Sequence, residues 1–120
     1  SSEVSIDPWI DRYIFPNGEL PCLAHLDAAS RKHLRAEDVE NLGADYDPTL
    51  MAWCQNFEQA WPSLREDYDE TFFRMWRYYL LSCAGAFRAR DLQVWQWVLS
   101  HPASLSGYRR PLRLTAAGGA

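Results

Sequence analysis

The sequence predicts a single mixed α/β unit that is mostly helical, with a short strand before and after two long helices. Residues 47–60 and 63–90 carry apolar side chains at gaps of three and four, which is typical of helices that bury one face. Residues 34–42 and 92–99 alternate apolar and polar side chains, which favours strands. With 120 residues, of which 48% are apolar and 23% charged, the chain has the composition of a globular unit with one core.

Two short helices are predicted in the first third of the chain. Asp7 can cap a helix that has Pro8 at its first position, and the turn-forming residues 16–18 end it. Pro21 begins a second helix, which buries one apolar stripe and fades near His33. Both helices are expected to turn one face toward the core.

The middle of the chain predicts a strand, a turn and the start of a helix. Residues 34–42 alternate imperfectly, with Val39 as their one β-branched residue, so we expect an edge strand. Residues 43–47 are expected to form a turn. Asp47 then caps the next helix, with Pro48 at its first position.

The two long helices follow one another. Pro62 is expected to end the first because proline interrupts helical hydrogen bonding. The second begins with a capping box at Ser63 and Glu66, or restarts at a second cap, Asp69, and reaches about residue 90. Between residues 75 and 87, apolar side chains surround its axis, which predicts burial on nearly all sides.

The last strand and the tail are distinguished by composition. The strand predicted at 92–99 places Trp95 and Trp97 on one face. The residues after 100 are rich in proline, serine and glycine and are expected to be loose. We therefore divide the chain into a domain segment, 1–100, and a C-terminal tail, 101–120.

Charge and cysteine content argue against several classes of protein. The net charge of −4 and the pI near 5.3 argue against a nucleic-acid binder, whose binding face would be basic. Three cysteines without a CxxC pair predict reduced thiols rather than a disulfide framework or a zinc site, and we assign no metal. No apolar run reaches the roughly 20 residues of a membrane span, so we expect a soluble cytoplasmic protein.

Three blocks of the sequence carry a family resemblance. The runs DPWIDRYIFPNGELP (7–21), GADYDPTLMAW (43–53) and RMWRYYLLSCAGAFRARDLQVWQ (74–96) closely resemble the C-terminal part of bacterial cyclopropane-fatty-acyl-phospholipid synthases. The likeness extends over about residues 7–100. It implies that the two strands are the last two of a class I methyltransferase sheet, the doubly wound α/β fold. They would pair antiparallel, with the two long helices inserted between them.

The resemblance also implies an activity. Such enzymes transfer the methyl group of S-adenosylmethionine to a cis double bond of phospholipid acyl chains, and a bound bicarbonate ion accepts the released proton. A ring product and a methyl-branched product both stay open. The chain has no G-x-G-x-x-G loop after a strand, so the cofactor is expected to bind mainly to residues outside it. Since Ser1 is also no initiator methionine, we expect either a longer polypeptide or a partner chain that supplies the N-terminal half.

Tyr46 is the candidate catalytic residue. Judged from the residues alone, packing of the turn is the more common role for such a tyrosine, although its phenol can donate to an anion. The resemblance assigns Tyr46 as a bicarbonate ligand. Its neighbours Asp45 and Asp47 are interpreted as a solvent-facing acid and a helix cap rather than a metal-binding pair.

Phe72, Trp76 and Tyr79 are candidate substrate-binding residues. Their spacing places them on one helix face, so a role in the core is the default interpretation. The resemblance places this helix beside the acyl channel, which must be apolar because water would quench a carbocation. Both roles stay open.

The expected partners follow from the same resemblance. They are phospholipid acyl chains, the upstream half of the enzyme and the inner-membrane surface, which the protein would contact peripherally, while a homodimer stays open. Arg109, Arg110 and Arg113 form a small basic tail that could touch anionic lipid. A solubilising tail is the more common use of such residues.

One stretch departs from the family pattern. Val39 and Glu40 stand where the synthases that the sequence resembles usually carry a large aromatic residue and a histidine. A different lipid substrate therefore stays open. So does an alternative function, in which the chain is a non-catalytic remnant or subunit that binds a lipid surface or a partner.

Overall fold

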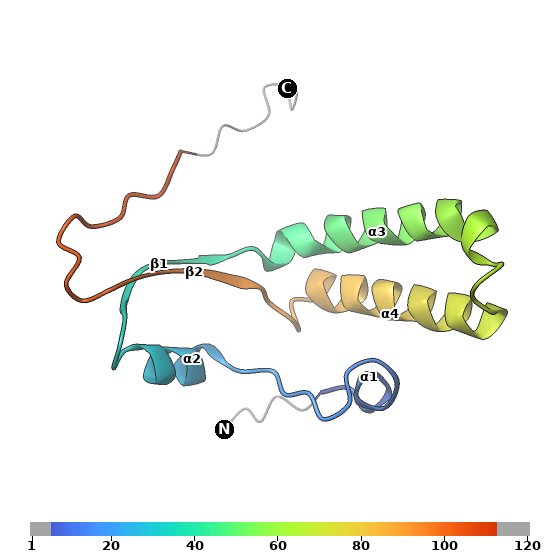
Figure 1. Ribbon diagram of the computed structural model, residues 1–120, viewed down its shortest axis with the longest axis horizontal. Coiled ribbons are helices and arrows are strands. Elements are labelled where there is room, and N and C mark those ends of the chain that lie inside the picture. Colours follow the sequence, from blue (N-terminus) through green and yellow to red (C-terminus); the bar gives the residue numbers. More distant parts are fainter. Residues whose placement is uncertain (1–5, 113–120) are drawn as a thin grey trace.

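The computed structural model describes residues 6–112. The chain forms, in order, α1 (Pro8–Tyr13), α2 (Leu23–Ser30), β1 (Arg35–Asn41), α3 (Gly43–Leu64), α4 (Glu70–Arg88) and β2 (Trp95–Ser100). β1 leads directly into α3, and α4 runs back beside α3 and leads into β2 (Figure 1). The two strands and two helices therefore form one long hairpin, and this hairpin positions the candidate site.

The two strands pair antiparallel, as expected from the family resemblance, with Asn41 opposite Trp95 at one end and Arg35 opposite Ser100 at the other. The register shifts between Ala36 and Asp38. There the extra residue, Glu37, accepts a hydrogen bond of 2.7 Å from the Ser100 hydroxyl. β2 begins later than predicted because residues 89–94 make the turn out of α4.

Two of the predicted helix caps are confirmed. The Asp7 carboxylate accepts the backbone N–H groups of Trp9 and Ile10 at 2.9 and 3.2 Å, with proline at the first position of α1. Asp69 accepts the N–H of Phe72 at 2.8 Å and begins α4. The alternative capping box at 63–66 is not used, because α3 extends into it.

The predicted start of α3 is wrong. The helix begins at Gly43 rather than after Asp47, so residues 43–47 are helical and not a turn. The reason is the Asn41 side chain, which accepts the Gly43 N–H at 2.9 Å and stabilises an earlier start. The predicted end at Pro62 is also wrong: this proline lies inside the helix, near its end.

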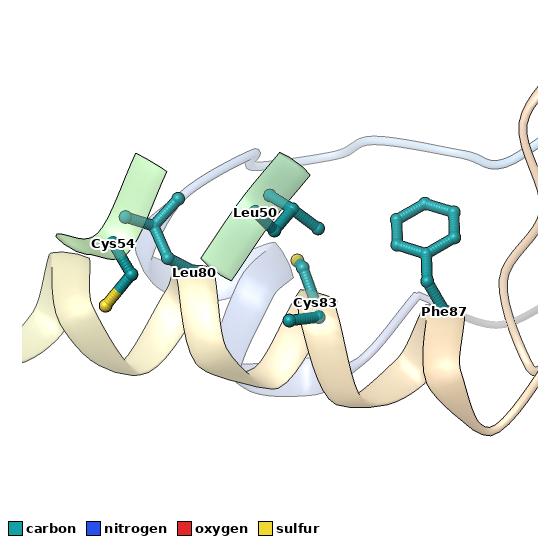
Figure 2. Packing of buried hydrophobic residues seen from close by; sticks show 6 residues of the cluster. Leu50, Cys54, Leu80, Cys83 and Phe87 are labelled. Carbon is teal, nitrogen blue, oxygen red and sulfur yellow. The ribbon is translucent and has the colours of Figure 1, made fainter. Parts of the chain in front are cut away.

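The core lies between α3 and α4 (Figure 2). Among residues 6–112, six hydrophobic residues are buried: Leu50, Cys54, Leu80, Cys83, Ala84 and Phe87. The prediction that α4 is buried on nearly all sides is wrong for the described residues, since Tyr78 is 54% exposed. The radius of gyration is 18.6 Å, whereas about 14 Å is usual for a compact chain of this length. The open hairpin shape leaves much of the aromatic surface of α4 uncovered.

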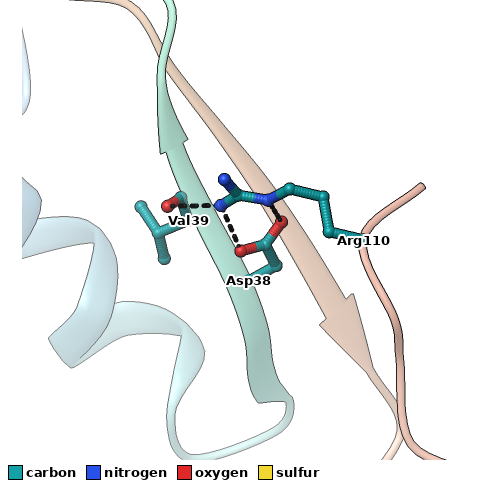
Figure 3. A network of polar contacts seen from close by, with 3 residues as sticks. All are labelled: Asp38, Val39 and Arg110. Carbon is teal, nitrogen blue, oxygen red and sulfur yellow. Dashed lines mark hydrogen bonds and ion pairs between the residues drawn. The ribbon is translucent and has the colours of Figure 1, made fainter. Parts of the chain in front are cut away.

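The chain after β2 is tied to β1 by two arginines. Arg35 donates to the carbonyl oxygens of Pro102 and Ser104 at 3.1 and 3.0 Å. Arg110 donates to both carboxylate oxygens of Asp38, at 2.8 and 2.5 Å, and to the Val39 carbonyl at 3.4 Å (Figure 3). The basic group of the tail is thus partly engaged with the strand, and its third arginine, Arg113, lies outside the described residues.

Candidate functional site

Tyr46 is the fourth residue of α3 and so lies in its first turn, not in a loop before the helix. Its ring packs against Phe87 of α4, with centroids 5.3 Å apart, and meets Trp53 edge-on at 6.3 Å. The side chain is half-buried against the core. Among the described residues its hydroxyl makes no hydrogen bond. The ring is therefore held by packing, and the phenol is available to a further partner.

The residue after Tyr46 is also held by α4. Arg88 donates to both carboxylate oxygens of Asp47, at 2.8 and 2.9 Å. These hydrogen bonds and the positive charge lower the pKa of the Asp47 carboxyl. Asp47 is thus an ion-pair partner across the hairpin instead of the helix cap that its position before a proline indicated.

The three predicted substrate residues are brought together in one aromatic row along α4. The rings of Phe72 and Trp76 lie 6.3 Å apart and within 6° of parallel. Trp76 and Tyr79 are 5.3 Å apart. Tyr68 extends the row at one end, 4.5 Å from Phe72, and Phe15 extends it at the other, 6.1 Å from Tyr79. Sequence reasoning missed the contribution of Phe15, because nothing local predicts that residues after α1 return to α4.

An apolar cavity of about 770 Å³ lies where α1 and the segment after it face α4. Tyr79 and Cys83 form part of its α4 wall, and Ile10, Phe15 and Leu20 form part of the opposite wall. Phe72 and Trp76 are not among its lining residues. Of the predicted substrate residues, the cavity therefore includes only Tyr79.

Burial suppresses the acidity of two groups in the cavity wall, the Tyr79 phenol and the Cys83 thiol. It raises the pKa of the Tyr79 phenol, to which the neighbouring Cys83 also contributes. Burial raises the pKa of the Cys83 thiol as well. Both groups are therefore neutral near pH 7, and the cavity wall carries no charge from them.

Tyr46 and the aromatic row form two separate groups. Tyr46 packs against Phe87, which lies eight residues beyond Tyr79 on α4, or about 12 Å along the helix axis. Tyr46 is not among the residues lining the cavity. Tyr46, the candidate anion ligand, therefore lies beyond one end of the aromatic row.

Across residues 6–112 no three histidine, cysteine, aspartate or glutamate side chains lie close enough together to hold a metal ion. Across the same range no helix is both long and apolar enough to cross a bilayer.

Comparison with known proteins gives the family. The sequence model described as mycolic acid cyclopropane synthetase matches residues 1–97. The cyclopropane-fatty-acyl-phospholipid synthase of Escherichia coli K12 is 54% identical over 99 residues, which cover 82% of this chain and 26% of that protein. A synthase of the same description from Citrobacter freundii is 53% identical over 78 residues, covering 65% of this chain and 88% of that sequence.

A solved structure shares the fold. The cyclopropane synthase MmaA2 from Mycobacterium tuberculosis matches with a TM-score of 0.72 at 25% identity, over 76% of this chain and 32% of that one. The chain spans about a quarter of the length of the E. coli relative. The strand pair with two inserted helices is therefore one part of a methyltransferase fold. Because the family match takes in most of the sequence, the chain belongs to the mycolic acid cyclopropane synthetase family.

Proposed function

We propose that this chain is the C-terminal portion of the catalytic domain of an S-adenosylmethionine-dependent enzyme. The enzyme would add a methylene group to a cis double bond of phospholipid acyl chains, which yields cyclopropane fatty acids. The observation that carries the proposal is the high identity to cyclopropane-fatty-acyl-phospholipid synthases, together with a half-buried Tyr46 whose hydroxyl is unengaged among the described residues. The chain alone is proposed to be inactive.

S-adenosylmethionine would supply the methyl group. Since the sequence has no glycine-rich nucleotide loop, we propose that the cofactor binds mainly to residues outside this chain. The contribution of residues 6–112 would be the apolar surroundings of the acyl chain and one ligand of an anion.

Tyr46 fits the role of bicarbonate ligand. Its phenol is a hydrogen-bond donor, and its ring is fixed by Phe87 and Trp53, so the donor needs little reorganisation to meet an anion. Bicarbonate bound there would serve as the acceptor for the proton that the alkylated acyl chain releases. The other ligands of the ion would come from outside this chain.

The aromatic row and the cavity fit an acyl chain. A long alkene needs an apolar surface that excludes water, and Tyr79, at one end of the row Phe72–Trp76–Tyr79, also lies in the wall of the cavity. Aromatic faces would also stabilise a passing positive charge. We propose that the acyl chain lies along this surface.

An alternative is a non-catalytic module that binds a lipid surface or a partner chain. The exposure of large aromatic side chains favours it, since Tyr78 is 54% and Phe15 56% exposed. In either case we propose a cytoplasmic protein that contacts the inner membrane peripherally, with a homodimer as a further possibility.

Incubating the complete enzyme with S-adenosylmethionine and vesicles of unsaturated phospholipid tests the proposal. Mass spectrometry of the acyl chains should show an added methylene group, and NMR should show cyclopropane protons. Lipid binding without any change in acyl mass would support the module instead. Addition of a methyl branch without ring protons would keep the transferase but change its product.

A further inference from the structure

Two consecutive residues of α3 are held by two consecutive residues of α4. Phe87 packs its ring against Tyr46. The next residue, Arg88, donates two hydrogen bonds from Nε and Nη2 of its guanidinium group to the Asp47 carboxylate. Only 18% of the Asp47 side chain is exposed. The Asp47–Arg88 ion pair therefore fixes the turn of α3 that carries Tyr46 from the side of α4.

The backbone gives this turn less support than an ordinary helical turn receives. Pro48 has no N–H, so the Ala44 carbonyl lacks its helical donor four residues along. The Thr49 hydroxyl donates to the Asp45 carbonyl at 2.9 Å and supports the backbone beside that gap. With one helical hydrogen bond missing, a tie to the neighbouring helix matters more for the position of this turn.

We propose that Arg88 is a positioning residue for the chemistry at Tyr46. Its ion pair with Asp47 keeps the first turns of α3 in one place, so that the Tyr46 hydroxyl stays in the orientation that a bound bicarbonate requires. Arg88 itself does not touch the reacting groups. The inference rests on the proposed function, because it needs Tyr46 to be the anion ligand.

The hairpin offers a matched control. Arg77 of α4 donates to Glu58 of α3 at 2.7 Å, which makes a second ion pair between the same two helices. It lies eleven residues before Arg88, about 16 Å along the α4 axis from the contact that holds Tyr46. Arg77→Ala removes an interhelical ion pair without touching the turn of Tyr46.

The experiment measures bicarbonate affinity in the complete enzyme in two ways. One is the bicarbonate concentration that gives half-maximal turnover at saturating lipid and S-adenosylmethionine. The other is calorimetric titration with bicarbonate in the absence of lipid, which reports binding without catalysis. Melting temperature is followed for each variant.

Arg88→Ala is expected to weaken bicarbonate binding roughly threefold to thirtyfold, because Tyr46 then spends only part of its time in the binding orientation. Arg88→Lys keeps the charge but loses the bidentate contact, so its bicarbonate affinity should lie between those of the wild type and Arg88→Ala. Arg77→Ala should leave bicarbonate binding unchanged while lowering the melting temperature by a comparable amount. In a Tyr46→Phe background, Arg88→Ala should cost much less than it does alone.

The failures of the two ideas are distinguishable. If Tyr46→Phe weakens bicarbonate binding but Arg88→Ala does no more than Arg77→Ala, the positioning role is overturned and the proposed function stands. If Tyr46→Phe leaves both bicarbonate measurements at wild-type values, the anion role of Tyr46 falls and this inference falls with it. Should Arg88→Ala fail to fold, Arg88→Lys and Asp47→Asn give the same comparison.

Discussion

Val39 lies directly opposite Trp97 in the β1–β2 ladder. The family resemblance implies a large aromatic residue at position 39, whereas here a small residue on one strand faces a large aromatic on the other. The Trp97 indole N–H is buried and has no hydrogen-bond partner among the described residues. Val39 is also absent from the lining of the 770 Å³ cavity. Position 39 therefore belongs to a cross-strand pair and lies outside the cavity wall.

Exchanging the two side chains tests this pairing. Val39→Trp alone should destabilise the protein by about 1–3 kcal/mol, since two tryptophans would then face each other. Adding Trp97→Val should recover most of the loss, because total side-chain volume is restored. Urea unfolding of the two single variants and the double variant measures the coupling. Additive effects would mean that the two positions do not pack together.

Tyr46→Phe and Tyr46→Ala separate a chemical role from a packing role. Tyr46→Phe removes one donor to the proposed anion and should lower turnover by roughly five- to 150-fold, which corresponds to about 1–3 kcal/mol. Its melting temperature should change little because the ring contact with Phe87 remains. Tyr46→Ala should lose stability as well. Turnover at saturating lipid and thermal melting decide between them, and full activity of the phenylalanine variant would leave Tyr46 with packing alone.

Gly43 and Gly85 give opposite responses to alanine. A Cβ at Gly43 would lie 3.0 Å from the Asn41 side-chain oxygen and 3.2 Å from the Gln93 Cα, so Gly43→Ala should destabilise by about 1–3 kcal/mol. A Cβ at Gly85, within α4, would meet no atom within 4 Å. Gly85→Ala should therefore stabilise by about 0.5–1 kcal/mol. Chemical denaturation of both variants provides the measurement, and equal effects would contradict the close approach at Gly43.

The cap of α4 can be tested at Asp69. Asp69→Ala removes the acceptor for the Phe72 N–H and should cost about 1 kcal/mol of stability. Asp69→Asn keeps an acceptor oxygen and should stay close to wild type. Asp67→Ala, in the same interhelical loop, is the control because its carboxylate caps no helix. If both alanine variants lose the same stability, the effect comes from loop charge.

The bidentate ion pairs Asp38–Arg110 and Asp47–Arg88 should each lose stability in acid, independently of one another. Hydrogen bonds from Arg110 lower the pKa of Asp38, and those from Arg88 lower the pKa of Asp47. Each carboxylate is ionised more readily in the folded protein than in the unfolded chain. The stability it contributes is therefore present above its unfolded pKa of about 3.9 and is lost as pH falls through the lower, folded value.

Carbon-13 NMR of the side-chain carboxyl groups measures these titrations. Arg110→Ala should raise the titration midpoint of Asp38 and leave that of Asp47 in place, whereas Arg88→Ala should do the reverse. Movement of both midpoints in either variant would mean that the carboxylates respond to general loosening of the hairpin rather than to their own arginines.

The elements with local signals were predictable. The caps at Asp7 and Asp69 act within three residues, and the spacing of Phe72, Trp76 and Tyr79 alone puts them on one face of a helix. The start of α3 was not predictable in this way. Asp47 followed by proline is a strong local signal for a helix start, but Asp47 pairs with Arg88, 41 residues away.

In the candidate site, too, the residue could be identified from the sequence, but its contacts with distant residues could not. The family pattern singled out Tyr46, but its contacts with Phe87 and Trp53 depend on how α3 packs against α4. Phe15 joins the aromatic row across more than sixty residues of chain. Such contacts leave no periodicity in a local window, because they arise only when the hairpin closes.

Three contacts of the hairpin form nested loops, and a fourth, Asp38–Arg110, crosses the outermost of them, Glu37–Ser100. The Glu58–Arg77 pair spans 19 residues, Asp47–Arg88 spans 41, Glu37–Ser100 spans 63 and Asp38–Arg110 spans 72. Once an inner contact has formed, the next one outward has only a short additional stretch of chain to close, so its entropy cost is small. Folding is therefore expected to start where α3 meets α4 and to proceed toward the strands. The ion pair between Arg110 and Asp38 would then form last during folding and break first during unfolding.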